Sequence, residues 1–136
     1  MPNSENIKTV TLSIYADPVG SDHIFHLMKA PRDLTVLSAY MVSKTAQGAG
    51  TALKLRLENW GTGGAAVAGT VCAYVGGTAT GSQLAALTPA AATIDTTEDY
   101  IDEGEWLAVR YIEEGTGWVA NDRLTFTVNY VIGLGA

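Results

Sequence analysis

The feature that most constrains the fold is a repeated alternation of apolar and polar residues with a period of two. Segment 53–58 reads Leu-Lys-Leu-Arg-Leu-Glu, and segment 124–130 reads Leu-Thr-Phe-Thr-Val-Asn-Tyr. Segments 9–14 and 107–112 alternate in the same way. Because successive side chains of a strand point to opposite faces, each segment would place one face against a core and the other toward solvent or a neighbour.

Turn-forming residues separate these runs. Gly-rich residues 61–64 follow one run, and Asp102-Glu103-Gly104-Glu105 reads as a tight turn in which Gly104 is suited to a positive φ. We predict about eight strands, at 8–15, 23–28, 34–43, 52–58, 67–75, 92–96, 105–113 and 123–132. This spacing, without a convincing amphipathic helix, predicts a single-domain antiparallel β-sandwich of the jelly-roll type over residues 8–136, with polar residues 1–7 as a flexible N-terminal arm.

Charge limits the partners of such a domain. Charged residues make up only 16% of the 136-residue chain, below the usual level of about 25%, which suggests that a partner covers part of the surface. The net charge is −6 and the cations are scattered, so we expect neither nucleic acid nor an anionic membrane as a partner. No signal peptide and no apolar run of membrane-spanning length are found, so we expect a soluble protein made in a reducing cytoplasm.

Few residues are arranged for chemistry. Cys72 is the single cysteine and lies in an apolar run, which favours a small buried side chain. Gly61, Gly63 and Ala66 match the loose dinucleotide fingerprint, but a strand-like segment follows where the fingerprint needs a helix. His23 and His26 would point to opposite faces of a strand, which disfavours a shared metal. We therefore predict no cofactor, no metal, no catalytic residue and no enzyme activity.

An acidic cluster is the most unusual local feature. It falls within eleven residues and comprises Asp95, Glu98, Asp99, Asp102, Glu103 and Glu105. The spacing does not match an EF-hand loop. Three interpretations remain open: a solvated loop and strand edge, a weak Ca²⁺ site, and an electrostatic contact with a basic partner.

Four residues are candidates for an interface. Trp60 and Trp118 lie at predicted loop positions, where tryptophans either anchor interfaces or cap the ends of the sandwich. Ile132 and Leu134 belong to a C-terminal segment that is apolar for a terminus, which favours packing against a sister subunit.

The strand and turn pattern resembles a known group of proteins. The relevant segments are Ala30-Pro31-Arg32-Asp33-Leu34-Thr35-Val36, residues 101–109, Gly115-Thr116-Gly117-Trp118 and the closing strand 124–130. Together they resemble small jelly-roll structural proteins of tailed bacteriophages, particularly head decoration (cement) proteins. The likeness covers residues 8 to 132 as a style of strand and turn.

The resemblance implies a location on the virion exterior, on the phage head surface. It implies a homotrimer that binds the major capsid protein and stabilises the assembled shell by mass action and avidity. Two alternatives stay open: a glycan- or receptor-binding head-fibre or tail module, and a small enzyme of cupin-like shape, although the metal-ligand pattern of the latter is missing.

Overall fold

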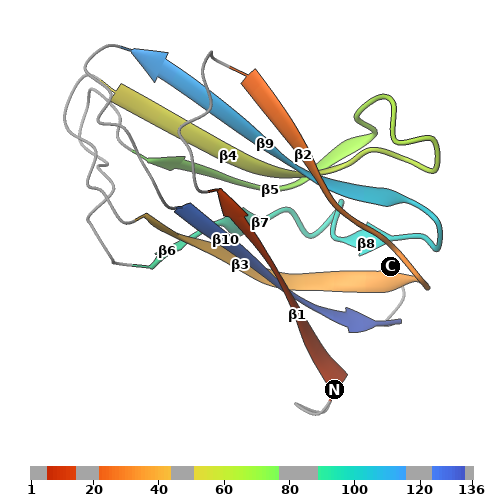
Figure 1. Ribbon diagram of the computed structural model, residues 1–136. Helices are drawn as coiled ribbons and strands as arrows, with labels where there is room; N and C mark the ends of the chain where they lie inside the picture. Colours follow the sequence, from red (N-terminus) through yellow and green to blue (C-terminus); the bar gives the residue numbers. More distant parts are fainter. Residues whose placement is uncertain (1–5, 15–21, 44–50, 77–88, 116–123, 134–136) are drawn as a thin grey trace.

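The computed structural model describes residues 6–14, 22–43, 51–76, 89–115 and 124–133. This part of the chain forms strands and no α-helix, and the strands make two sheets that pack face to face (Figure 1). The prediction of an all-β sandwich is confirmed. The strands are β1 (Ile7–Ile14), β2 (Asp22–Lys29), β3 (Leu34–Ser43), β4 (Thr51–Asn59), β5 (Gly69–Gly76), β6 (Ala90–Ala91), β7 (Thr93–Ile94), β8 (Tyr100–Ile101), β9 (Trp106–Gly115) and β10 (Leu124–Ile132).

The order of the strands is that of a jelly roll. The first sheet, called sheet A, has the order β1-β10-β3-β6, with β8 also paired to β3, and sheet B has the order β2-β9-β4-β5-β7. The first strand therefore pairs with the last, β2 pairs with β9, β3 pairs with the short strands β6 and β8, and β4 pairs with β5. All of these pairings are antiparallel, as expected for a long hairpin wrapped into two Greek keys.

The sixth predicted strand differs from the expectation. In place of one strand over 92–96, the chain makes the short strands β6, β7 and β8, which pair with β3, β5 and β3 respectively. The segment 90–101 thus passes from sheet A to sheet B and back, and places Ala92 and Ile94 against the core. Segment 90–101 closes one long side of the sandwich. A period of two predicts one continuous strand, so it cannot predict a segment that changes from one sheet to the other.

The core lies between the sheets and is built from the alternating residues. Leu55 and Leu57 of β4, Leu107 and Val109 of β9, and Phe126 of β10 are fully buried. Each belongs to the apolar face that the sequence pattern predicts. No helix among the described residues is long and apolar enough to cross a membrane.

Candidate functional site

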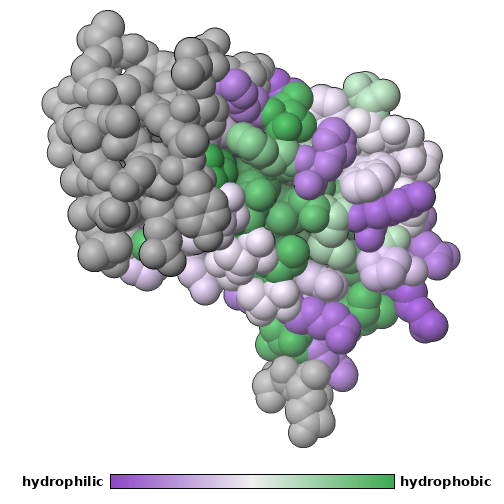
Figure 2. All heavy atoms as spheres, viewed as in Figure 1, coloured by the Kyte–Doolittle hydropathy of each residue, from purple (hydrophilic) through white to green (hydrophobic). Residues whose placement is uncertain are grey.

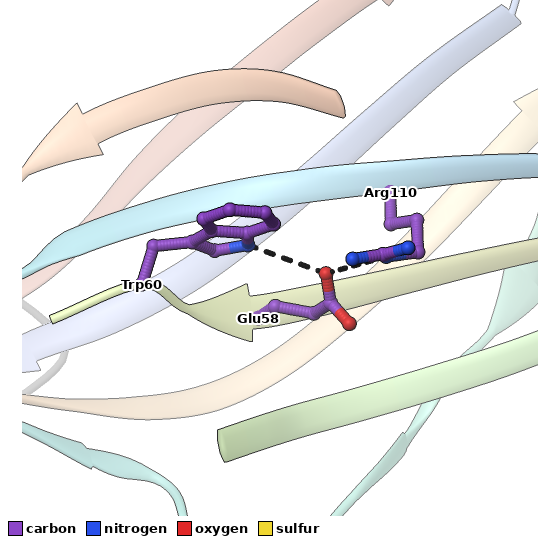
Figure 3. Close-up of polar contacts among 3 residues, drawn as sticks. All are labelled: Glu58, Trp60 and Arg110. Atoms are coloured by element: carbon purple, nitrogen blue, oxygen red, sulfur yellow. Dashed lines mark hydrogen bonds and ion pairs between the residues drawn. The ribbon is translucent and has the colours of Figure 1, made fainter. Parts of the chain in front are cut away.

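A buried carboxylate lies at the end of β4, on the outer side of sheet B. Figure 3 shows Glu58 between Trp60, which follows the strand, and Arg110 of β9. The Arg110 Nε donates to Glu58 Oε1 at 2.9 Å, and the Trp60 indole Nε1 donates to the same oxygen at 3.3 Å. The guanidinium carbon of Arg110 lies 5.7 Å from the centre of the Trp60 ring. Two donors, one of which is the Arg110 cation that also lies over the Trp60 ring, therefore compensate one carboxylate that is 2% exposed.

The loop that follows Trp60 is fastened to the neighbouring strands. His26 Nε2 donates to the Gly64 carbonyl at 3.0 Å, and the His26 ring makes edge contacts with Trp60 and Trp106. Gly64 has a φ of 65° and lies so close to Trp106 that an added Cβ would be 3.0 Å from its Cδ1 atom. Only glycine adopts this conformation readily, so Gly64 allows the loop to approach Trp106.

The position of Glu58 corrects a prediction. Its place in the alternating segment 53–58 predicts a side chain toward solvent or a neighbour, yet it is buried within this chain. The alternating pattern cannot predict that the Glu58 side chain is covered, because the side chains that cover it come from β9 and from the residues after β4. The cluster made by Glu58, Trp60, Arg110, His26 and Trp106 fastens a loop to a sheet, through the hydrogen bonds of Glu58 with Arg110 and Trp60 and the bond from His26 to the Gly64 carbonyl.

The four predicted interface residues are placed as follows. Trp60 is 9% exposed and contacts Glu58, Arg110 and His26, and both of its interpretations, an interface anchor and a cap of the sandwich end, stay predictions. Ile132 is 36% exposed. Trp118 and Leu134 lie outside the described residues, as do residues 1–5 of the predicted arm.

Ile132 borders an open depression of about 450 Å³, whose lining also includes Arg32, Asp33, Glu103 and Gly133. Asp33 organises this region. Its Oδ1 accepts from the Glu103 backbone N–H at 2.8 Å, and its Oδ2 accepts from the Tyr100 hydroxyl at 3.0 Å. The bond from Glu103, followed by that from Tyr100, holds the pKa of Asp33 below its usual value. The same hydrogen bond to Asp33 raises the pKa of Tyr100. The depression therefore has a lining held in place by hydrogen bonds, with acidic and basic side chains, and it is open to solvent.

The acidic cluster folds into two turns. Asp95 Oδ1 accepts from the backbone and hydroxyl of Thr97 at 2.9 and 2.7 Å, and these bonds, the hydroxyl first, lower the pKa of Asp95. Glu105 Oε1 accepts from the Asp102 N–H at 2.8 Å, and Gly104 has a φ of 87°, which confirms the predicted turn. Within the described residues, no group of three or more His, Cys, Asp and Glu is placed to hold a metal.

Three other candidate motifs are also resolved. His23 lies opposite Tyr111 and His26 opposite Ala108 in the register of β2 and β9, so the two histidines face opposite sides as predicted. The glycine loop 61–66 leads into β5, a strand, so no helix N-terminus is available for a pyrophosphate. Cys72 lies in β5 opposite Leu57.

Apolar side chains also reach the surface. Ile7, Ile24, Tyr40, Val67 and Ile132 are each between 36% and 45% exposed. Single exposed hydrophobic residues are ordinary, but Ile7 and Tyr40 lie on strands of one sheet, and Figure 2 shows apolar atoms gathered along β2 and between β2 and β1.

Comparisons with solved structures gave matches of low similarity. The structure of infectious bursal disease virus, Gx strain, matches with 15% identity and a TM-score of 0.43, covering 95% of this chain and 33% of that chain. The structure of the Gt strain matches with 14% identity and a TM-score of 0.40, covering 93% of this chain and 32% of that chain. The chain thus spans about a third of the length of the matched proteins. No family model and no curated protein matches it.

Proposed function

We propose that the protein is a non-enzymatic virion structural protein that binds the outside of a phage capsid as a homotrimer and stabilises the assembled shell. Its partner is the major capsid protein, and it is made in the host cytoplasm and located on the head surface. Neither a nucleic acid nor a membrane takes part. The strand and turn resemblance to head decoration proteins suggests this role.

One observation carries the proposal: three carboxylates among the described residues, those of Glu58, Asp33 and Asp95, are engaged in contacts that hold the fold together. Glu58 is shared by Arg110 and Trp60, Asp33 holds Glu103 and Tyr100, and Asp95 holds Thr97. Meanwhile large apolar side chains remain exposed. A catalytic group must be available to a substrate, whereas a binding protein needs a rigid scaffold with uncovered apolar surface.

Stabilisation of a shell then follows from mass action. A protein that binds the assembled lattice and not its dissociated subunits stabilises the lattice by about 2.7 kcal/mol per site at a free concentration of 100 times Kd. Joining three copies makes the second and third contacts intramolecular, which raises the overall affinity without a new contact.

The test uses purified protein and heads of the phage that encodes it, stripped of bound proteins. We expect saturable co-sedimentation with expanded heads and a higher temperature of head disruption once the sites are filled. Absence of binding to heads would refute the proposal. Binding to defined sugars on a glycan array, without binding to heads, would instead support a glycan-binding fibre or tail module.

A further inference from the structure

One long side of the sandwich is open, and an edge of each sheet borders it. Among the described residues, β1 pairs only with β10 and β2 pairs only with β9, so each of these strands has one edge without a neighbouring strand. Figure 1 shows the two strands along the same side of the molecule. On the opposite side, segment 90–101 pairs with both sheets. The open side is therefore where the described sandwich has free backbone groups for a further strand.

Apolar side chains reach the surface on this side. Val10 and Leu12 of β1 and Phe25, Leu27 and Met28 of β2 pack against the core, yet each is only partly buried. Figure 2 shows apolar atoms gathered along β2 and between β2 and β1. We call these five residues the apolar strip. Covering the strip removes apolar surface from water, which favours the binding of a partner that brings apolar side chains of its own.

Of the two edges, β1 is better suited to pair with an added strand. Its register against β10 is regular from Ile7 to Ile14, and Lys8 is its only charged residue. The register of β2 against β9 shifts between His26 and Met28, and a bulge of this kind disturbs pairing at an edge. About half of the residues of an antiparallel strand turn N–H and C=O groups to a given side, so about four residues of β1 present them at the free edge. An extended segment offers matching groups at the same spacing.

Two exposed lysines define the charge that such a segment should carry. Lys8 stands near the start of β1, and Lys29 is the last residue of β2. These strand ends lie at the same end of the sandwich, because β2 leads through residues 30–33 into β3, whose start pairs with the end of β10, beside the start of β1. Within the described part of the chain, neither lysine forms an ion pair. Carboxylates of the added segment at this end would complement both.

A second copy of this chain fits the edge less well than a segment of another protein. Its β1 has no carboxylate and would bring a second Lys8. Its β2, laid antiparallel to β1, would bring Lys29 next to Lys8. Like charges in adjacent positions of a sheet oppose pairing. Charge complementarity therefore favours a foreign segment.

We propose that the free edge of β1 is a docking site for an extended segment of a partner protein, which adds to sheet A as an antiparallel strand. The segment has apolar residues at alternate positions, which cover the apolar strip, and acidic residues at its C-terminal end, which face Lys8 and Lys29. Within the proposed function the capsid protein supplies this segment, and the inference rests on that function only for the identity of the supplier.

The test uses two labelled, amidated synthetic peptides. Both have eight residues of alternating valine and threonine, followed by two glutamates in the first peptide and by two lysines in the second. We expect fluorescence anisotropy to give at least a fivefold lower Kd for the glutamate peptide. The net charge of −6 would by itself favour the lysine peptide, so the opposite preference is diagnostic of the lysines at the edge. Hydrogen–deuterium exchange should slow more in β1 than in β2 when the glutamate peptide binds.

Three variants locate the site. Lys8→Glu should lower the ratio of the two Kd values at least threefold. Arg56→Glu makes the same change of charge on the outer face of sheet B and should leave the ratio within twofold. Val10→Lys places a charge on the apolar strip and should raise the Kd of the glutamate peptide at least tenfold. Circular dichroism checks the fold of each variant, and if V10K unfolds, K8E and the exchange pattern decide alone.

Three results would overturn this inference. They are the absence of binding by either peptide, a preference for the lysine peptide, and slow exchange of the free-edge amides of β1 in the unbound protein, which would mean that the edge is already covered. Co-sedimentation with phage heads separates the two proposals. Heads that bind the protein without slowing exchange in β1 refute the docking site and leave the proposed function standing. Peptide binding at β1 without binding to heads supports the docking site and refutes the proposed function.

Discussion

Removing Arg110 tests whether the buried Glu58 carboxylate depends on its ion pair. The side chain of Glu58 is 3% exposed and that of Arg110 is 20% exposed. Deleting one partner of a buried pair costs about 3–5 kcal/mol, because a charge is left without compensation. Partial exposure of Arg110 and the remaining Trp60 donor at 3.3 Å both reduce this loss, so we expect about 2–3 kcal/mol for Arg110→Ala.

The expected loss is large enough to measure by heat. An unfolding entropy of about 2.1 cal/mol/K per residue gives roughly 0.3 kcal/mol/K for a chain of 136 residues. The melting temperature of R110A should therefore fall by about 7–10 °C in a circular dichroism scan, with a matching fall in the urea midpoint. Arg56→Ala is the matched control, because Arg56 lies directly opposite Arg110 on the same sheet, and we expect at most about 0.5 kcal/mol for it.

A double-mutant cycle with Glu58→Gln isolates the pair. In the E58Q background the buried charge is gone, so R110A should cost less than half of what it costs in the unchanged protein. Equal losses for R110A in the two backgrounds, or equal losses for R110A and R56A, would refute the reasoning.

Two further predictions concern the loop and the pH dependence. Gly64→Ala should destabilise the protein by about 1–2 kcal/mol, because alanine is strained at a φ of 65° and its Cβ would press on Trp106, whereas Gly63→Ala, with open space around it, should change the urea midpoint little. Equal midpoints for the two variants would contradict this. The folded pKa of Asp33 is lowered, so its contribution to stability is complete above the unfolded value of about 3.9 and is lost as the pH falls through the folded pKa. The pKa of Tyr100 is raised, so its contribution is present below about pH 10 and is lost as the pH rises through the folded pKa. Asp33→Asn should flatten both limbs of a plot of stability against pH, and unchanged limbs would argue against the Asp33 contacts.

The positions of the long strands followed from the sequence. Alternation in segments 53–58 and 124–130 marks the residues that are buried, because a strand has no other way to separate its two faces. The turn at residues 102–105 was also predictable, since Gly104 takes the positive φ that the turn requires. These are local signals, and each is read from a few adjacent residues.

Burial on the outer side of a sheet was decided by the tertiary structure alone. Glu58 and Arg56 occupy equivalent places in the alternating pattern, yet contacts with Arg110 and Trp60 bury Glu58, whereas Arg56 is partly exposed. The tertiary structure also decided the pairing of segment 90–101 with both sheets. It likewise decided the side-chain hydrogen bonds that join Thr9, Asn129 and Ser38 across β1, β10 and β3. The alternating pattern determines which way a side chain points, but only the assembled sheets decide what lies on the other side of it.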